Sequence, residues 1–201
     1  MSGPNILILG IGNLLWADEG FGVRVVQALE ELYEFPAEVS LLDGGTQGLA
    51  LIPYVQAVDT LVIIDAVDFQ LEPGMLVELR DGEVPAYLGA KKMSLHQISF
   101  QEVLALCQLL GNCPARLVLI GVQPAVLEDY GGSLSPVVKA QMRPAMDRVL
   151  GYLAEMGVAA TPKAQSLAQG HGAIGMKEYE RHRPSAEAAC RFGDGRFLGQ
   201  I

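Results

Sequence analysis

Asn5-Ile-Leu-Ile-Leu-Gly10 is a short apolar run that ends in glycine, and Thr60-Leu-Val-Ile-Ile-Asp65 repeats the pattern with an aspartate at its end. Continuous apolar runs of this length are typical of strands that are buried on both faces of a parallel sheet. Residues 39–42 and 116–122 give two further buried strands, and residues 75–80 alternate as a half-exposed strand does. The sequence therefore predicts about five strands.

Helical patterns separate these runs. They fall at residues 22–33, 49–57, 99–110 and 136–156. Ser99-Phe-Gln-Glu102 has the form of a capping box, which predicts that the third helix begins at Ser99 and that His96 lies in the loop before it. Alternating strands and helices predict an α/β fold, a three-layer αβα sandwich with a twisted, mainly parallel sheet and helices on both faces.

The chain has 201 residues, half of them hydrophobic, which favours one domain with a sizeable core. We expect a single α/β domain over residues 1–160. From 161 to 201 the sequence loses its periodicity and becomes rich in Gly, Ala, Gln and Arg. This composition predicts a C-terminal tail that is flexible or docks weakly on the domain.

Composition also excludes several classes of function. The net charge of −9 argues against a nucleic-acid partner, which would require a basic face. No segment approaches the roughly 20 apolar residues of a membrane span, and the start of the chain lacks the features of a secretory signal. The spacing of Cys107, Cys113 and Cys190 is not that of a zinc cluster. We expect a cytoplasmic protein with reduced thiols, no nucleic-acid partner and no membrane insertion.

Acidic residues follow the predicted strands, at the edge where open α/β sheets bind ligands. Glu19 lies in the loop after the first strand, Asp43 follows the second, Asp65 ends the third, and His96 precedes a helix. Carboxylates that lie close together raise each other's pKa values, and a bound cation relieves that repulsion. A Glu, an Asp and a His suit zinc, manganese, iron or nickel and leave coordination positions open for water or substrate.

Each of these residues also has an ordinary structural interpretation. Asp65 can cap the segment after its strand, Glu19 can favour the first turn of a helix, His96 can be a solvated loop residue, and Asp43 can shape a turn before two glycines. Their common edge is what favours a functional site.

Other enzyme classes fit less well. Gly10-x-Gly12 resembles part of a dinucleotide fingerprint, but Leu15 stands where the third glycine is needed. Asp18 and Glu19 are acidic where a pyrophosphate would bind. The sequence contains no G-x-S-x-G elbow and no H-E-x-x-H helix.

Several motifs together resemble the [NiFe]-hydrogenase maturation endopeptidases, in particular the branch that serves membrane-bound uptake hydrogenases. The likeness runs over about residues 5–157. Its motifs are Gly10-Ile-Gly-Asn-Leu-Leu-Trp-Ala-Asp-Glu-Gly-Phe-Gly-Val-Arg24, Asp43-Gly-Gly-Thr-Gln-Gly48, Ile64-Asp-Ala66, Lys92-Met-Ser-Leu-His-Gln97, Gly121-Val-Gln-Pro-Ala125 and Asp129-Tyr-Gly-Gly-Ser-Leu-Ser135. The resemblance implies a mainly parallel sheet sandwiched by helices.

The resemblance also implies a function. The family removes a C-terminal extension from the hydrogenase large-subunit precursor after nickel insertion, and the nickel in the precursor is what the protease recognises. The family's metal ligands fall on Glu19, Asp65 and His96, with Asp43 as a supporting residue or general base. We expect a monomer that uses the substrate's nickel, although other divalent metals can occupy the site in vitro. A non-catalytic, metal-sensing checkpoint of hydrogenase assembly stays open as the alternative, and so does the choice between metal and carboxylate as activator of water.

Overall fold

The computed structural model describes residues 4–90, 95–164 and 175–182, and of residues 87–90 and 95–99 it describes the backbone alone. A five-stranded sheet of order β3-β1-β4-β6-β5 forms its centre. The strands are β1 (Ile6–Ile11), β3 (Val39–Gly45), β4 (Thr60–Ala66), β5 (Leu76–Arg80) and β6 (Arg116–Val122). The first three and β6 are parallel, while β5 pairs antiparallel with β6 at the edge. The predicted mainly parallel sheet is confirmed.

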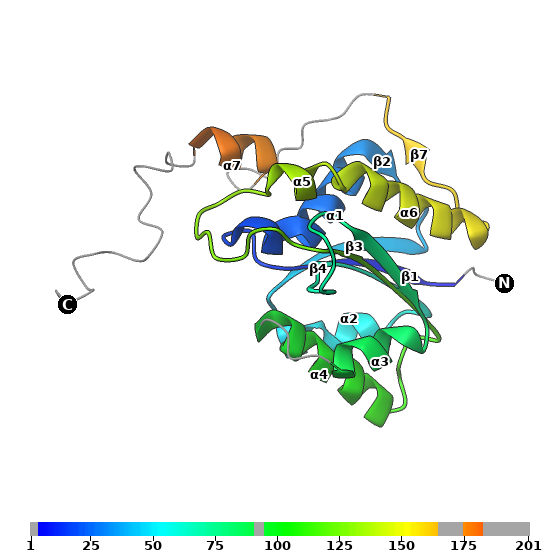
Figure 1. Ribbon diagram of the computed structural model, residues 1–201. Coiled ribbons are helices and arrows are strands. Elements are labelled where there is room, and N and C mark those ends of the chain that lie inside the picture. Colours follow the sequence, from blue (N-terminus) through cyan, green and yellow to red (C-terminus); the bar gives the residue numbers. More distant parts are fainter. Residues whose placement is uncertain (1–3, 91–94, 165–174, 183–201) are drawn as a thin grey trace.

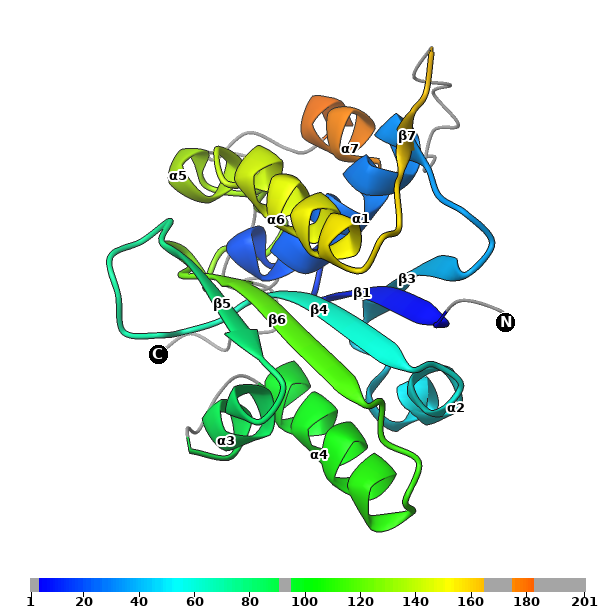
Figure 2. The ribbon, with the colours of Figure 1, turned by 90° about the vertical axis from the view of Figure 1, so that its right-hand side faces the viewer.

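Helices cover both faces of this sheet, so the predicted three-layer sandwich is confirmed (Figure 1). One face carries α1 (Phe21–Leu32), α5 (Pro136–Lys139) and α6 (Met142–Glu155), with α7 (Met176–His182) beside them; the other carries α2 (Ile52–Gln56), α3 (Glu83–Ala90) and α4 (Leu95–Leu109) (Figure 2). Two short 3₁₀ helices, η1 (Ala17–Gly20) and η2 (Gly48–Leu51), lead into α1 and α2.

Successive side chains of the central strands point alternately into two hydrophobic clusters. Ile8 and Ile64 pack with residues of α1 and α6, whereas Leu9 and Ile63 pack with Val103 and its neighbours on α4. Because helices cover both faces, successive side chains are apolar whichever way they point, which is why these strands are continuous hydrophobic runs in the sequence.

The structure differs from the sequence prediction around His96. Residues 83–90 form α3 and α4 begins at Leu95, so His96 lies in the first turn of α4 and Ser99 is inside the helix instead of capping it. Pro85 is tolerated because it stands in the first turn of α3, where backbone N–H groups have no partner within the helix. No Gly or Pro lies between residues 93 and 110 to prevent α4 from starting early.

The last predicted helix is divided in two. α5 ends at Lys139 and α6 begins at Met142. Pro144 explains the break, because in a continuous helix its ring would clash with the carbonyl of Ala140, and it has no N–H to donate to that carbonyl.

Parts of the predicted tail form regular structure. β7 (Thr161–Pro162) pairs antiparallel with β2 (Tyr33–Glu34), and α7 lies against the domain on the side of α1 and α5 (Figure 2). Local periodicity gave no sign of α7 because its seven residues make under two turns of helix.

Candidate active site

The carboxyl ends of β3, β1, β4 and β6 meet at one edge of the sheet. Gly10 pairs with Asp43 on one side and with Ile64 on the other, and Asp65 pairs with Gly121. Asp43 and Asp65 are thus separated by one intervening strand, or about 10 Å between their strands. The structure places both predicted carboxylates at the same edge.

The two carboxylates point to opposite faces. Ile64 belongs to the cluster with α1, so its successor Asp65 faces the side of α4, where Ile63 and Leu61 also point. Asp43 shares register with Ile64 through Gly10 and therefore faces α1. Asp65 is 4% exposed, and one of its carboxylate oxygens accepts a 2.8 Å hydrogen bond from the N–H of Ala66.

Two glycines allow the start of α1 to lie very close to the end of the sheet. A side-chain carbon on Gly22 would overlap the carbonyl oxygens of Ile11 and Ile64, and one on Gly10 would lie 2.5 Å from the carbonyl oxygen of Gly22. These contacts hold the first turn of α1 beside the backbone of Ile64. Glu19, three residues before Gly22, is thereby kept near the end of β4 and Asp65.

Gly12 fixes the turn that carries Glu19. Its φ of 131° lies in a region that side-chain-bearing residues rarely adopt, and a side-chain carbon there would overlap the carbonyl oxygen of Glu19. The space above this glycine is filled by the protein's own chain. The Gly10-x-Gly12 pattern therefore serves chain packing, and it does not leave the open cradle that a dinucleotide phosphate would need.

Glu19 is half-buried in η1, and its burial raises the pKa of its carboxyl above the ordinary value. The N–H of Glu19 donates to the carbonyl of Trp16, which closes the turn. A cation beside this carboxyl would favour its charged form and so offset the cost of burial. The electrostatics of Glu19 fit a metal ligand.

Its neighbour Asp18 has a different task. Asp18 is fully buried, and its Oδ2 accepts hydrogen bonds from the N–H groups of Ala125 (2.9 Å) and Val126 (2.8 Å). Ser135 donates to the same carboxylate through its N–H (2.6 Å) and its Oγ (2.9 Å). Four donors satisfy this buried charge. Asp18 therefore clamps the loop after β6 to the turn that carries Glu19.

His96 reaches the same edge through α4. Phe100, Val103 and Cys107 of α4 pack on the sheet face to which Asp65 points. α4 is followed by a short connection to Arg116 at the start of β6, so the helix runs antiparallel to β6 and its first turn lies at the carboxyl edge of the strands (Figure 2). The backbone of His96 is thus on the edge and face of Asp65. Its side chain is outside the described part of the structure.

Among the residues whose side chains are described, no three His, Cys, Asp or Glu residues come together as a ready metal site. A triad that includes His96 falls outside that set. What the structure supplies is the placement of Glu19, Asp65 and the first turn of α4 at one edge.

Asp43 is exposed at the end of β3, and its carboxylate favours the charged form of Arg24 on α1. Arg24 is 3% exposed, and burial lowers the pKa of its guanidinium below the ordinary value, against the effect of Asp43 and of Glu180 on α7. Sequence reasoning missed this buried cation, because an arginine on an amphipathic helix is ordinarily solvated.

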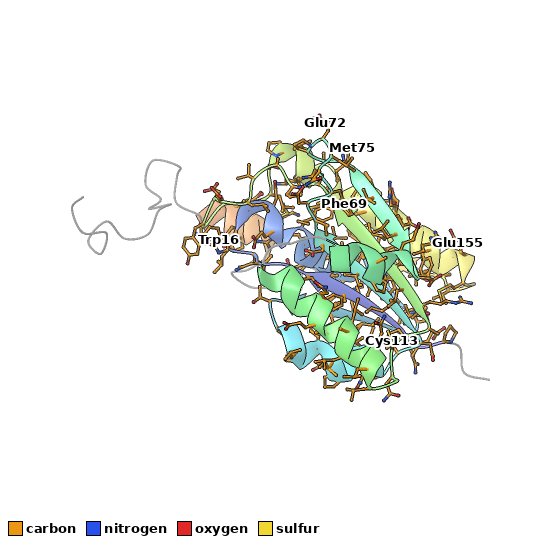
Figure 3. All side chains as sticks on the ribbon, turned by 60° about the horizontal axis from the view of Figure 1, so that its bottom comes forward. Trp16, Phe69, Glu72, Met75, Cys113 and Glu155 are labelled. Atoms are coloured by element: carbon orange, nitrogen blue, oxygen red, sulfur yellow. The ribbon has the colours of Figure 1, made fainter. Side chains whose placement is uncertain are left out.

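The sequence analysis also did not identify Phe69 and Gln123 as residues that support the end of the sheet. The ring of Phe69 lies over Gly121, where a side-chain carbon would be 2.6 Å from it, and Gly121 is the pairing partner of Asp65. Gln123 holds this segment, since its Oε1 accepts from the N–H groups of Phe69 (2.8 Å) and Leu71 (3.1 Å) and its Nε2 donates to Asp68 (3.1 Å). Figure 3 labels Phe69 together with Glu72 and Met75, which belong to the same connection between β4 and β5. Asp68 is thus engaged in fixing a loop.

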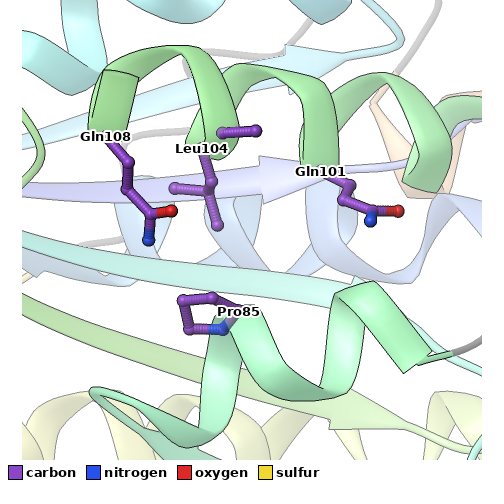
Figure 4. Close-up of a pocket in the computed structure, with 5 residues that line it drawn as sticks. Pro85, Gln101, Leu104 and Gln108 are labelled. Carbon is purple, nitrogen blue, oxygen red and sulfur yellow. The ribbon is translucent and has the colours of Figure 1, made fainter. Parts of the chain in front are cut away.

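Two hollows accompany these elements. A shallow depression of about 430 Å³ runs along Asp68 and residues 123–128, beside the edge. A smaller hollow of about 180 Å³ lies between α3 and α4, lined by Pro85, Leu104, Ala105 and two glutamines (Figure 4). The described residues that line the second hollow include no ionisable or nucleophilic group, so the edge of the sheet is the better candidate site.

Known proteins share this architecture. A family model described as hydrogenase maturation protease matches residues 23–152. The hydrogenase expression/formation protein HupM of Azotobacter chroococcum is 57% identical over 202 residues, which cover 99% of this chain and 96% of that protein. The solved structure of the hydrogenase maturating endopeptidase HybD from Escherichia coli is similar with a TM-score of 0.76 and 43% identity, over 80% of this chain and 98% of that one. The chain belongs to the hydrogenase maturation protease family.

As a member of this family the chain is a hydrolase, an endopeptidase. The hydrogenase 2 maturation protease of E. coli is 45% identical over 159 residues, which cover 79% of this chain and 96% of that protein. The length of this match is close to that of the α/β domain here, which ends with α6 at Glu155. In the described part of the chain, no helix combines the length and apolar character needed to cross a membrane.

Proposed function

We propose that this endopeptidase removes the C-terminal extension of the [NiFe]-hydrogenase large-subunit precursor after nickel insertion, and that Glu19, Asp65 and His96 bind the nickel of that precursor. The observation that carries the proposal is the close approach of Gly22 to the carbonyl of Ile64. It brings the turn of Glu19 beside Asp65, at the edge where the first turn of α4 also lies.

The chemistry of the donors supports this assignment. Two carboxylates and an imidazole suit nickel and leave positions for the precursor's own ligands. Burial disfavours the charged forms of carboxylates, as the raised pKa of Glu19 indicates, and a divalent cation compensates for that. The three donors lie on separate elements of the chain, and we propose that the metal of the substrate brings them together as ligands.

Nickel bound in this way would lie next to the scissile peptide, where it can polarise the carbonyl or lower the pKa of a water molecule. The orientation of Asp43 toward α1 and Arg24 supports an electrostatic role for Asp43, since a general base must lie within hydrogen-bond reach of the water it activates. We therefore assign Asp43 to the support of Arg24, with activation of water on the side of Asp65.

The test is cleavage of purified, nickel-loaded precursor, followed by intact-protein mass spectrometry. Glu19→Gln and Asp65→Asn keep the shape of each side chain and remove its charge, so we expect at least a hundredfold slower cleavage with unchanged folding. Glu72→Gln is the matched control, because Glu72 is an exposed carboxylate on the loop of Phe69. Nickel-free precursor should stay uncut. Normal cleavage by both ligand variants would refute the ligand assignment, and cleavage of nickel-free precursor would refute nickel recognition.

A further inference from the structure

Helix α7 is held on the domain by specific polar contacts. Glu180 Oε1 accepts hydrogen bonds from Ser133 Oγ and from Lys139 Nζ, both at 2.8 Å, and Lys139 also donates to Oε2 at 2.9 Å. The hydroxyl of Tyr179 donates to the carbonyl of Gly132 at 3.4 Å. Met176 packs against the hydrophobic cluster of α1 and α6. Residues 132–139 are therefore the main polar seat of α7.

The buried Arg24 side chain of α1 also contacts α7. The guanidinium carbon of Arg24 lies 5.2 Å from the centre of the Tyr179 ring, and Glu180 favours its charged form. Burial raises the pKa of the Glu180 carboxyl, but hydrogen bonds from Lys139 and Ser133 together with the charges of Lys139 and Arg24 outweigh burial, so its pKa lies below the ordinary value. A half-exposed Lys–Glu pair alone stabilises little. The bond to Ser133 and the aromatic cover of Arg24 make this contact specific.

The segment under α7 is also the segment that holds the turn of Glu19. The N–H of Gly131 donates to the carbonyl of Leu15 at 2.7 Å, and Trp16 forms backbone bridges with Tyr130 and Gly132. The rings of Trp16 and Tyr130 meet edge to face, with 5.3 Å between their centres. Ser135, two residues after the partner of Glu180, donates both its bonds to Asp18. Contacts thus run continuously from α7 through residues 130–135 to residues 15–18, which immediately precede Glu19.

The relatives differ in this part of the chain. The A. chroococcum protein matches 99% of the chain, whereas the E. coli protease uses 96% of its own length to match only 79%. A segment of the size of the region beyond α6 is thus shared with one relative and lacking in the other. α7 lies beyond α6 and rests on the shared domain through residues that belong to it.

We propose that Tyr179 and Glu180 of α7 are positioning residues for proteolysis, which act through Ser133 and Gly132 to hold the turn that presents Glu19. The proposal rests on the proposed function for its catalytic part. Its structural part concerns the link between α7 and Trp16, which can be measured without substrate.

The experiment compares Glu180→Gln with Glu178→Gln in the full-length protein. Glu178 is the matched control because it lies on the same helix and pairs with Arg181 and His182 of that helix. Trp16 is the chain's single tryptophan, so tryptophan fluorescence reports on the turn at Trp16 that residues 130–132 contact. For Glu180→Gln we expect acrylamide quenching of Trp16 to rise at least twofold. On nickel-loaded precursor we expect kcat to fall roughly tenfold while KM stays within twofold of the wild-type value. The reason is that misplacement by a fraction of an ångström slows catalysis more than it weakens binding. Glu178→Gln should match the wild type.

Three results would overturn the proposal. Equal quenching in the two variants would mean that α7 does not hold the Trp16 turn. Increased quenching with unchanged kcat would mean that the turn needs no such support for proteolysis. A raised KM with unchanged kcat would make α7 a precursor-binding element instead. If the wild type fails to cut the precursor, the proposed function fails, and the quenching comparison still decides whether α7 positions the turn.

Discussion

The close approach of α1 to the sheet predicts a large effect of adding one methyl group at Gly10. A side-chain carbon there would lie 2.5 Å from the carbonyl oxygen of Gly22, 2.8 Å from its carbonyl carbon and 2.9 Å from a methyl of Val26. Ordinary carbon–oxygen contacts are about 3.3 Å. Gly10→Ala must therefore move the start of α1 by about 0.8 Å away from β1, since the atoms that it meets are mostly backbone.

Both stability and activity should respond. Overpacking of this kind costs about 1–3 kcal/mol, which lowers Tm by roughly 2–12 °C in a domain of this size. The displaced turn carries Glu19, and a misplacement near 1 Å costs on the order of a hundredfold in rate. Scanning calorimetry measures the first effect, and cleavage of nickel-loaded precursor at a temperature well below Tm measures the second.

The control is the same substitution in open space. Apart from its chain neighbours and the backbone of its own helix, no described atom lies within 4 Å of a side-chain carbon built on Gly151, which is exposed within α6. Gly151→Ala should raise stability by up to about 1 kcal/mol, because alanine is the better helix former, and should leave cleavage unchanged. If Gly10→Ala kept both Tm and cleavage rate at the level of the wild type, the glycine contact would not be what positions Glu19.

Three further predictions concern single side chains. Asp18→Asn places an amide N–H₂ against N–H and O–H donors that face a carboxylate in the wild type. The free energy of unfolding should fall by roughly 2 kcal/mol, and Tm by at least about 4 °C. A change in Tm within 1 °C would show that the hydrogen bonds to Asp18 are dispensable. Because the pKa of Glu180 is lowered in the folded protein, its stabilisation is complete above the ordinary value of 4.5 and is lost as pH falls through the folded value. The gap in urea-unfolding free energy between wild type and Glu180→Gln should accordingly narrow from pH 6 to pH 3, and a constant gap would contradict this. His96→Ala should abolish processing at unchanged Tm, and added divalent metal should shift the His96 ring resonances in NMR less strongly once Asp65 is changed to Ala; full processing together with no metal response would remove His96 from the site.

The sequence by itself determined the layers of the fold. Arg116–Val122 is a strand over the predicted residues, and the other strand predictions deviate from the structure mainly at their ends. Burial on both faces of a parallel sheet leaves a continuous apolar run, and that run is visible without any knowledge of partners. It also places Asp43 and Asp65 at one edge, because parallel strands share the end at which they stop.

Local chain preferences around His96 were harder to predict, because competing signals overlap there. A serine with a glutamate three positions later resembles a cap, yet α4 starts earlier because the residues before Ser99 form helix as readily. A proline is tolerated in the first turn of a helix, but it also prevents an earlier helix from continuing through it. Pro85 opens α3, whereas Pro144 separates α5 from α6.

Only the tertiary structure decided which acidic residues fix loops and which lie at the edge of the candidate site. Asp18 and Glu19 are adjacent in the sequence, but Asp18 is bound by donors more than a hundred positions away while Glu19 is left at the edge. The same holds for Arg24, whose cover comes from Tyr179 on α7. Hydrogen bonds between distant segments depend on where the packed layers bring those segments together, and periodicity within a short window carries no information about that distance.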